Sequence, residues 1–102
     1  MKVYLDDLRD TPVGFVRTYT VEETIELLKT RQVEVLSLDN DLGTDQPEGW
    51  TTLDWLEEVI YNDPTFPIPE MHVHSANSTR VDHMKRAILS IERIRQQQIG
   101  GE

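Results

Sequence analysis

An apolar segment that ends in carboxylates, residues 33–43, limits the folds open to this chain more than any other stretch. It has the sequence Val-Glu-Val-Leu-Ser-Leu-Asp-Asn-Asp-Leu-Gly. A short run of β-branched and leucine residues bounded by turn residues is typical of a strand buried on both faces. In open α/β sheets, ligands bind beyond the carboxyl ends of such strands. We therefore expect Asp39 and Asp41 to lie at a ligand-binding edge of a parallel sheet.

Two other expected strands also lead into polar residues. Residues 2–5 are followed directly by Asp6 and Asp7, and residues 71–74 are followed by Ser-Ala-Asn at 75–77. Because the carboxyl ends of parallel strands meet at one edge of a sheet, these side chains are expected close together. The sequence thus predicts one functional site along that edge.

Strand and helix patterns alternate through the rest of the chain. Thr20 and Glu23 form a capping box, which predicts the start of a helix. The order strand, loop, strand, helix, strand, helix, strand, helix predicts a parallel sheet with right-handed crossovers. The first and third strands should be central, which leaves the last strand as an edge open to pairing with another chain. The expected elements are strands 2–5, 15–19, 33–38 and 71–75, helices 21–31 and 50–62, and a last helix capped by Ser78 or Thr79.

The length and composition favour one soluble domain. With 102 residues, the chain has room for one modest core, expected over residues 1–95, with a frayed C-terminal tail at 96–102. No apolar run approaches the ~20 residues of a membrane span, and the first strand begins too early for a signal peptide. The absence of cysteine excludes disulfides and thiolate chemistry. A cytoplasmic location fits these features.

The charge of the chain limits its partners. A formal net charge of −9 argues against an extended nucleic-acid surface, but not against binding a nucleic-acid end through a metal. Part of the acidity is concentrated at Asp6, Asp7, Asp39 and Asp41. Mutual repulsion at such a cluster favours either a bound cation or a raised pKa.

With these motifs, the chain resembles the receiver domains of two-component response regulators over nearly its whole length. In that family an acidic pair holds Mg²⁺, an aspartate accepts a phosphoryl group, and a hydroxyl contacts that group. The resemblance assigns Asp6 and Asp7 to the pair, Asp39 to the acceptor and Ser75 to the hydroxyl. The loop at 9–14 takes the place of the first receiver helix, and the fifth strand, with its essential lysine, has no counterpart.

In these departures from the receiver pattern, the chain resembles a narrower family, the cyclic-phosphate processing receiver domains. The similar segments are Leu-Asp-Asp-x-Arg-x-x-Pro at 5–12, Ser-Leu-Asp-x-Asp-Leu-Gly at 37–43, His-x-His-Ser-Ala-Asn at 72–77, and Met84. The resemblance implies an α/β fold: a truncated receiver-like, flavodoxin-like three-layer sandwich without the first helix or the fifth strand and helix. Its four-stranded parallel sheet would have the order 2-1-3-4. The family name implies processing of cyclic phosphate ends in RNA repair.

The acidic residues are candidates for a magnesium site. Mg²⁺ prefers oxygen ligands, keeps several waters and takes one or two carboxylates from a protein. Asp7 and Asp39 are the expected direct ligands, with Asp6 acting through water and the Asp41 carbonyl contributing. The alternative is that Asp6 and Asp7 only cap a turn.

Asp39, Asp41 and His74 are the candidate catalytic residues. Asp39 would be a nucleophile or a metal ligand, and Asp41, two positions on, would position water or shuttle a proton. Asp41 also resembles the second aspartate of haloacid-dehalogenase-like phosphatases; alternatively, it merely opens the loop before Gly43. His74 would act as a general acid or base, whereas His72, on the same strand face, is better explained as a core residue.

The candidate phosphate ligands are Arg9, Ser75 and Asn77. A phosphoryl site needs positive charge besides the metal, and Arg9 directly follows the acidic pair. Asn77 would orient a phosphoryl oxygen, cap the following helix, or do both.

Two functions are consistent with the sequence. The first is a Mg²⁺-dependent phosphoryl-handling enzyme, either a phosphatase or a cyclic phosphodiesterase, that acts on a phosphorylated small molecule or an RNA end. The alternative is a non-catalytic, degenerate receiver that senses a ligand or binds a protein. In either case, a homodimer through the edge strand is expected.

Overall fold

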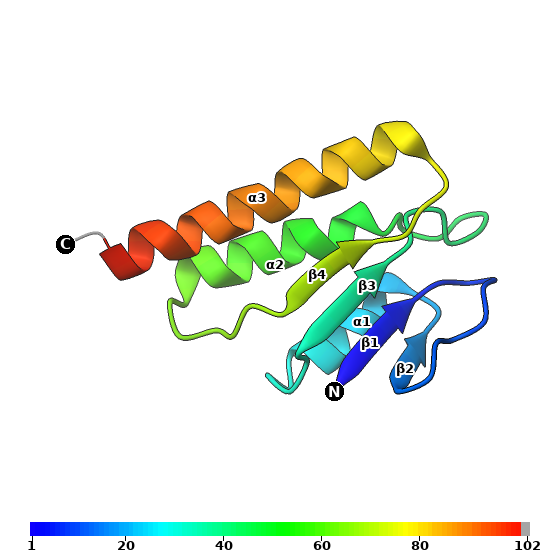
Figure 1. The fold of residues 1–102 in the computed structure, drawn as a ribbon, viewed down its shortest axis with the longest axis horizontal. Helices are drawn as coiled ribbons and strands as arrows, with labels where there is room; N and C mark the ends of the chain where they lie inside the picture. Colours follow the sequence, from blue (N-terminus) through cyan, green and yellow to red (C-terminus); the bar gives the residue numbers. More distant parts are fainter. Residues whose placement is uncertain (101–102) are drawn as a thin grey trace.

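The computed structural model describes residues 1–100 and arranges them as a parallel sheet with helices along it (Figure 1). In this part of the chain, four strands have the order β2-β1-β3-β4 and all neighbours are parallel. The predicted α/β class, strand order and missing first helix are therefore confirmed. The elements are β1 (Lys2–Leu5), β2 (Phe15–Thr18), α1 (Val21–Leu28), β3 (Val35–Leu38), α2 (Trp50–Asn62), β4 (Glu70–Val73) and α3 (Ser78–Gly100).

The described helices share one hydrophobic core with a single face of the sheet. The register aligns Val3 of β1 with Leu36 of β3, and Leu5 with Leu38, and these side chains are fully buried in that core. Helix α1 packs against α2, and α2 runs beside α3 (Figure 1). Residues 1–100 therefore form two layers, where a three-layer sandwich was expected, because no helix among them covers the other face. The side chains that α1, α2 and α3 bury in this core are Val21, Leu28, Leu53, Leu56, Ile60, Met84 and Ile91.

Side-chain caps start two of the helices. The capping box predicted for α1 is confirmed: the Glu23 amide donates to Thr20 Oγ1, and the Thr20 amide donates to the Glu23 carboxylate, both at 3.2 Å. Helix α3 is capped by Asn77 rather than by Ser78 or Thr79, since Asn77 Oδ1 accepts from the Arg80 amide at 3.1 Å. One of the two uses predicted for Asn77 is thus observed.

The C-terminal part of the chain differs from the prediction. Residues 96–100 are the last turns of α3 instead of a frayed tail, while residues 101–102 lie outside the described part. Gln98 donates its side-chain amide to the Ile60 carbonyl at the end of α2, at 2.7 Å. The Ile60 carbonyl also accepts the Asp63 amide at 3.3 Å, so Gln98 adds a second donor at this helix end and ties the last turns of α3 to α2.

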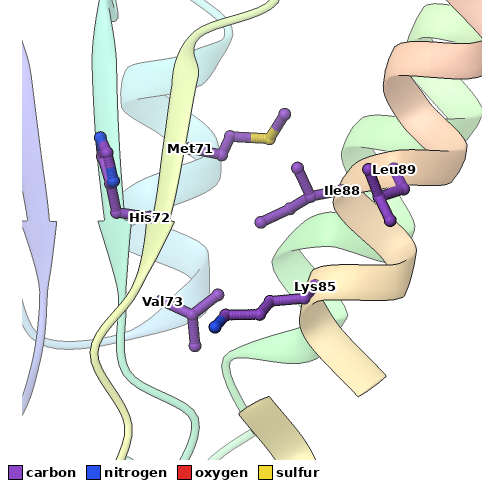
Figure 2. A pocket seen from close by; sticks show the side chains of 6 residues that line it. All are labelled: Met71, His72, Val73, Lys85, Ile88 and Leu89. Carbon is purple, nitrogen blue, oxygen red and sulfur yellow. The ribbon is translucent and has the colours of Figure 1, made fainter. Parts of the chain in front are cut away.

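Strand β4 lies at an edge of the sheet, as predicted, and α3 is beside it. Figure 2 shows Met71 and Val73 pointing toward α3 and His72 pointing away from it. A groove of about 470 Å³ lies between the strand and the helix. Its other lining residues are Lys85, Ile88 and Leu89 of α3. A homodimer through this edge stays a prediction.

Among residues 1–100, no helix combines the length and the apolar composition needed to cross a bilayer.

Candidate functional site

The carboxyl ends of β1 and β3 bring the predicted acidic cluster together. Asp6, Asp7 and Asp39 each offer an oxygen, and these oxygens lie within 4.8 Å of one another. The cluster opens into a cavity of about 310 Å³. This cavity is lined by Asp7, Leu8, Arg9, Asp39, Asp41 and Ala76.

Asp6 is fully buried and held by donors on both oxygens. Its Oδ1 accepts the backbone amides of Leu8 and Arg9 at 2.8 and 2.9 Å, so it organises the turn after β1. Its Oδ2 lies 2.8 Å from Arg9 Nη1 and 3.0 Å from His74 Nε2. Burial alone would raise the pKa of Asp6, but the hydrogen bonds from Arg9, Leu8 and His74 outweigh it and place the pKa well below its usual range. Asp6 is therefore ionised.

Asp39 follows β3 and is nearly as buried, with 5% exposure. Its Oδ1 accepts the Asn40 amide at 2.7 Å, and its Oδ2 lies 3.3 Å from Arg9 Nη1. Burial raises the pKa of Asp39 above its usual value, and the charge on Asp6 adds to this, although the Asn40 amide and Arg9 oppose the shift. A cation at this position would stabilise the ionised form of Asp39.

The third carboxylate has an oxygen left over for a ligand. Asp7 Oδ1 is buried and has no hydrogen-bond partner within the described chain. Buried polar atoms are nearly always paired in native proteins, so an unpaired oxygen in a carboxylate cluster fits a cation ligand. The residues present thus fit a divalent cation with oxygen ligands, which Asp7 and Asp39 would hold, as the sequence predicted.

His74 contacts Asp6 but is not among the residues that line the cavity. Its Nε2 contacts Asp6 Oδ2, its Nδ1 lies 2.7 Å from Ser37 Oγ, and its ring stacks on Tyr4 with centroids 4.4 Å apart. Burial lowers the pKa of His74 below its ordinary 6.5, an effect that the hydrogen bond to Asp6 only partly offsets. Neutral His74 would accept a hydrogen bond from the Ser37 hydroxyl at Nδ1 and donate its Nε2–H to Asp6. These contacts favour a role in orienting Asp6.

The lowered pKa of His74 predicts a pH-dependent stability. Between the native pKa and 6.5, the unfolded chain binds a proton that the native protein does not, so the free energy of unfolding falls as the pH is lowered through this window. Urea unfolding between about pH 5 and pH 7.5 should show this loss, and His74→Gln should reduce it. His72→Gln, an exposed neighbour on β4, is the matched control. An equal pH slope for His74→Gln and the wild type would contradict the prediction.

Asp41 is exposed and lines the cavity together with Asp39. Its Oδ1 accepts only a 3.2 Å contact from the Asn40 side chain within residues 1–100, so the carboxylate is open to water. The structure thus brings Asp41 to the predicted site.

The loop after β4 uses its predicted phosphate ligands to begin α3. Ser75 Oγ accepts the Asn77 amide at 3.1 Å, and Asn77 in turn caps the helix. Of this loop, Ala76 lines the cavity. The role of Ser75 and Asn77 in binding phosphate stays a prediction.

His72 is exposed and pairs with Glu70 at 2.6 Å. The prediction of a core histidine is therefore wrong, because the His72 side chain lies on the face of the sheet that no described helix covers.

Several residues that support the site were not predicted from the sequence. Fully buried Asn40 accepts the Trp50 amide at 3.1 Å through Oδ1 and donates to Glu48 at 2.8 Å through Nδ2. It thereby joins the end of β3 to the start of α2. Ser37 and Tyr4 position His74. A polar residue inside an apolar strand, such as Ser37, was the one available signal.

A comparison with protein families identifies the family of this chain. The model of the family described as Cyclic-phosphate processing Receiver domain matches residues 1–90, and these include every residue of the cluster and the cavity. Searches of curated proteins and of solved structures gave no significant match. Since the family model covers most of the chain, the protein belongs to the cyclic-phosphate processing receiver domains.

Proposed function

We propose that this domain is a Mg²⁺-dependent phosphoryl-handling enzyme that hydrolyses a phosphate ester, with a terminal cyclic phosphate of RNA as the substrate class. The observation that carries the proposal is the cluster of Asp6, Asp7 and Asp39, in which Asp7 Oδ1 is buried without a partner among residues 1–100. Membership of the family supports the choice of a cyclic phosphate.

Different cavity residues would carry out different steps of the hydrolysis. Bound Mg²⁺ would supply positive charge to the phosphate oxygens. Asp41, which is exposed and lines the cavity, would accept a proton from an attacking water. Addition of that water to phosphorus breaks the bond to one ring oxygen, which takes a proton, and a cyclic phosphate becomes a monoester. In a phosphatase reaction, Asp39 would instead attack phosphorus and displace the alcohol, which takes a proton, so that an aspartyl phosphate forms. Water would then add to this phosphorus, releasing inorganic phosphate and restoring the Asp39 carboxylate.

His74 supports this chemistry from outside the cavity. It contacts Asp6 and Ser37, and it does not line the space that a substrate would occupy. We therefore assign His74 a positioning role: it fixes the carboxylate of Asp6, which in turn holds the turn that carries Asp7 and Arg9.

A non-catalytic domain is the second candidate. No lysine lines the cavity in the part of the chain described, in agreement with the lack of a counterpart to the receiver strand that carries the essential lysine. Arg9 supplies the cationic side chain there, and it is already paired with Asp6 and Asp39. A domain that binds a phosphorylated ligand without turnover would have the same cluster.

Backbone NMR of the isotope-labelled chain tests the proposal directly. Titration with Mg²⁺ is expected to shift the resonances of Asp6, Asp7 and Asp39, and beryllofluoride, a mimic of an aspartyl phosphate, is expected to shift Asp39 and Ser75 further. If neither reagent moves these resonances, the metal-dependent function is wrong.

Phosphorus NMR then separates the two candidates. Incubation with Mg²⁺ and a nucleoside 2′,3′-cyclic phosphate should yield a monoester if the domain is a cyclic phosphodiesterase, and a phosphomonoester substrate should yield inorganic phosphate if it is a phosphatase. Binding of Mg²⁺ without either product would favour the non-catalytic domain.

A further inference from the structure

We propose that Arg9 competes with the divalent cation for the same carboxylates, and that this competition couples cation binding to phosphate binding. The inference rests on the proposed function and adds a regulatory role for one residue of that site. In the structure, Arg9 Nη1 bridges Asp6 Oδ2 at 2.8 Å and Asp39 Oδ2 at 3.3 Å. Arg9 thus places one positive charge between two of the three clustered acids.

The hydrogen bonds of Asp6 show why the two cations compete. Within residues 1–100 its carboxylate accepts from two backbone amides, from Arg9 Nη1 and from His74 Nε2. A carboxylate has about four acceptor positions, so none remains for a further ligand while these donors are in place. The backbone amides and His74 belong to the folded framework. The Arg9 side chain, which is 43% exposed, is the donor that is able to leave.

Electrostatics gives the direction of the coupling. A guanidinium next to a divalent cation is repelled by it, so occupancy of the cluster by the cation favours release of Arg9. The Arg9 backbone amide stays bound to Asp6 Oδ1 at 2.9 Å, which keeps the freed side chain at the cavity that it already lines. Arginine donates in a planar fork that suits phosphate oxygens. Cation and phosphate should therefore bind with positive cooperativity, and each should strengthen the other by the same factor.

Arg9→Gln tests the competition. The variant is expected to bind Mg²⁺ about tenfold more tightly than the wild type in the absence of phosphate, because a neighbouring positive charge is gone. Inorganic phosphate should tighten Mg²⁺ binding by the wild type and leave the Mg²⁺ affinity of the variant unchanged. Isothermal titration with Mg²⁺, with and without inorganic phosphate, measures both effects on the full chain.

The controls make each outcome decisive. Arg80→Gln removes an arginine of similar exposure, 40%, from a pair with Glu48, and its Mg²⁺ affinity should equal that of the wild type. If Arg9→Gln does not fold, Arg9→Met, which also removes the positive charge but keeps an unbranched side chain, should bind Mg²⁺ more tightly and lose the coupling. Unchanged or weaker Mg²⁺ binding by the Arg9 variant would overturn the competition alone, whereas a wild type that binds no Mg²⁺ would overturn the proposed function as well.

Discussion

An Asp39→Asn variant is expected to fold normally and to lose Mg²⁺ affinity by roughly 100-fold or more, since changing even a residue that only hydrogen-bonds to a metal ligand costs about 10- to 100-fold. The amide can still accept the Asn40 backbone N–H, which Asp39 Oδ1 accepts at 2.7 Å. It also removes a buried charge beside Asp6, and burial already raises the pKa of Asp39. The free energy of unfolding at neutral pH should therefore be unchanged or higher, while the cation site is lost.

The measurement is Mg²⁺ titration by calorimetry together with urea unfolding. Asp54→Asn, an exposed aspartate on α2, is the matched control and should keep wild-type affinity. Retention of wild-type Mg²⁺ affinity by Asp39→Asn would exclude Asp39 as a ligand. The same variant separates the two candidate functions, because an enzyme should lose turnover and a binding domain should keep its protein partner.

A Gly49→Ala variant is expected to lose more than about 3 kcal/mol of stability, at or beyond the upper end of ordinary overpacking. A Cβ at Gly49 would lie 1.8 Å from the Asp39 carbonyl oxygen and 3.0 Å from Asn40 Cα. The backbone of Gly49, with φ −57° and ψ −30°, is itself acceptable for alanine. The whole cost therefore comes from the clash, and because both neighbouring atoms belong to the main chain, no rotamer change relieves it.

Urea unfolding of the variant checks this expectation, with Gly100→Ala as the control. Gly100 is the last residue of α3 and has nothing within 4 Å of an added Cβ, so that alanine should be neutral or slightly stabilising. The clash at Gly49 should also move the end of β3 and weaken Mg²⁺ binding. A Gly49→Ala protein within about 1 kcal/mol of the wild type would contradict the close approach of β3 and α2.

The sequence predicted the elements whose signals are local. Helix α2 spans Trp50–Asn62, as its periodicity predicted, and the box of Thr20 and Glu23 starts α1. The acidic cluster was predictable as well, since the carboxylates directly follow strands whose ends parallel pairing brings to one edge. Helix α3 was the exception. Its last turns are polar, and their order depends on contacts such as the one between Gln98 and Ile60.

The sequence by itself thus determined the positions of the strands and helices, because hydrophobic periodicity and turn residues act over a few neighbours. The resemblance to receivers implied the strand order, and parallel pairing of the strands accounts for the gathering of Asp6, Asp7, Asp39 and Asp41. Only the tertiary structure decided what each carboxylate contacts. In the structure, His74 contacts Asp6 outside the cavity, and Arg9 pairs with both Asp6 and Asp39. Gly49 lies in close contact with the backbone that follows β3. The physical reason is that hydrogen bonds and close contacts between distant segments depend on how the elements pack, which local patterns do not specify.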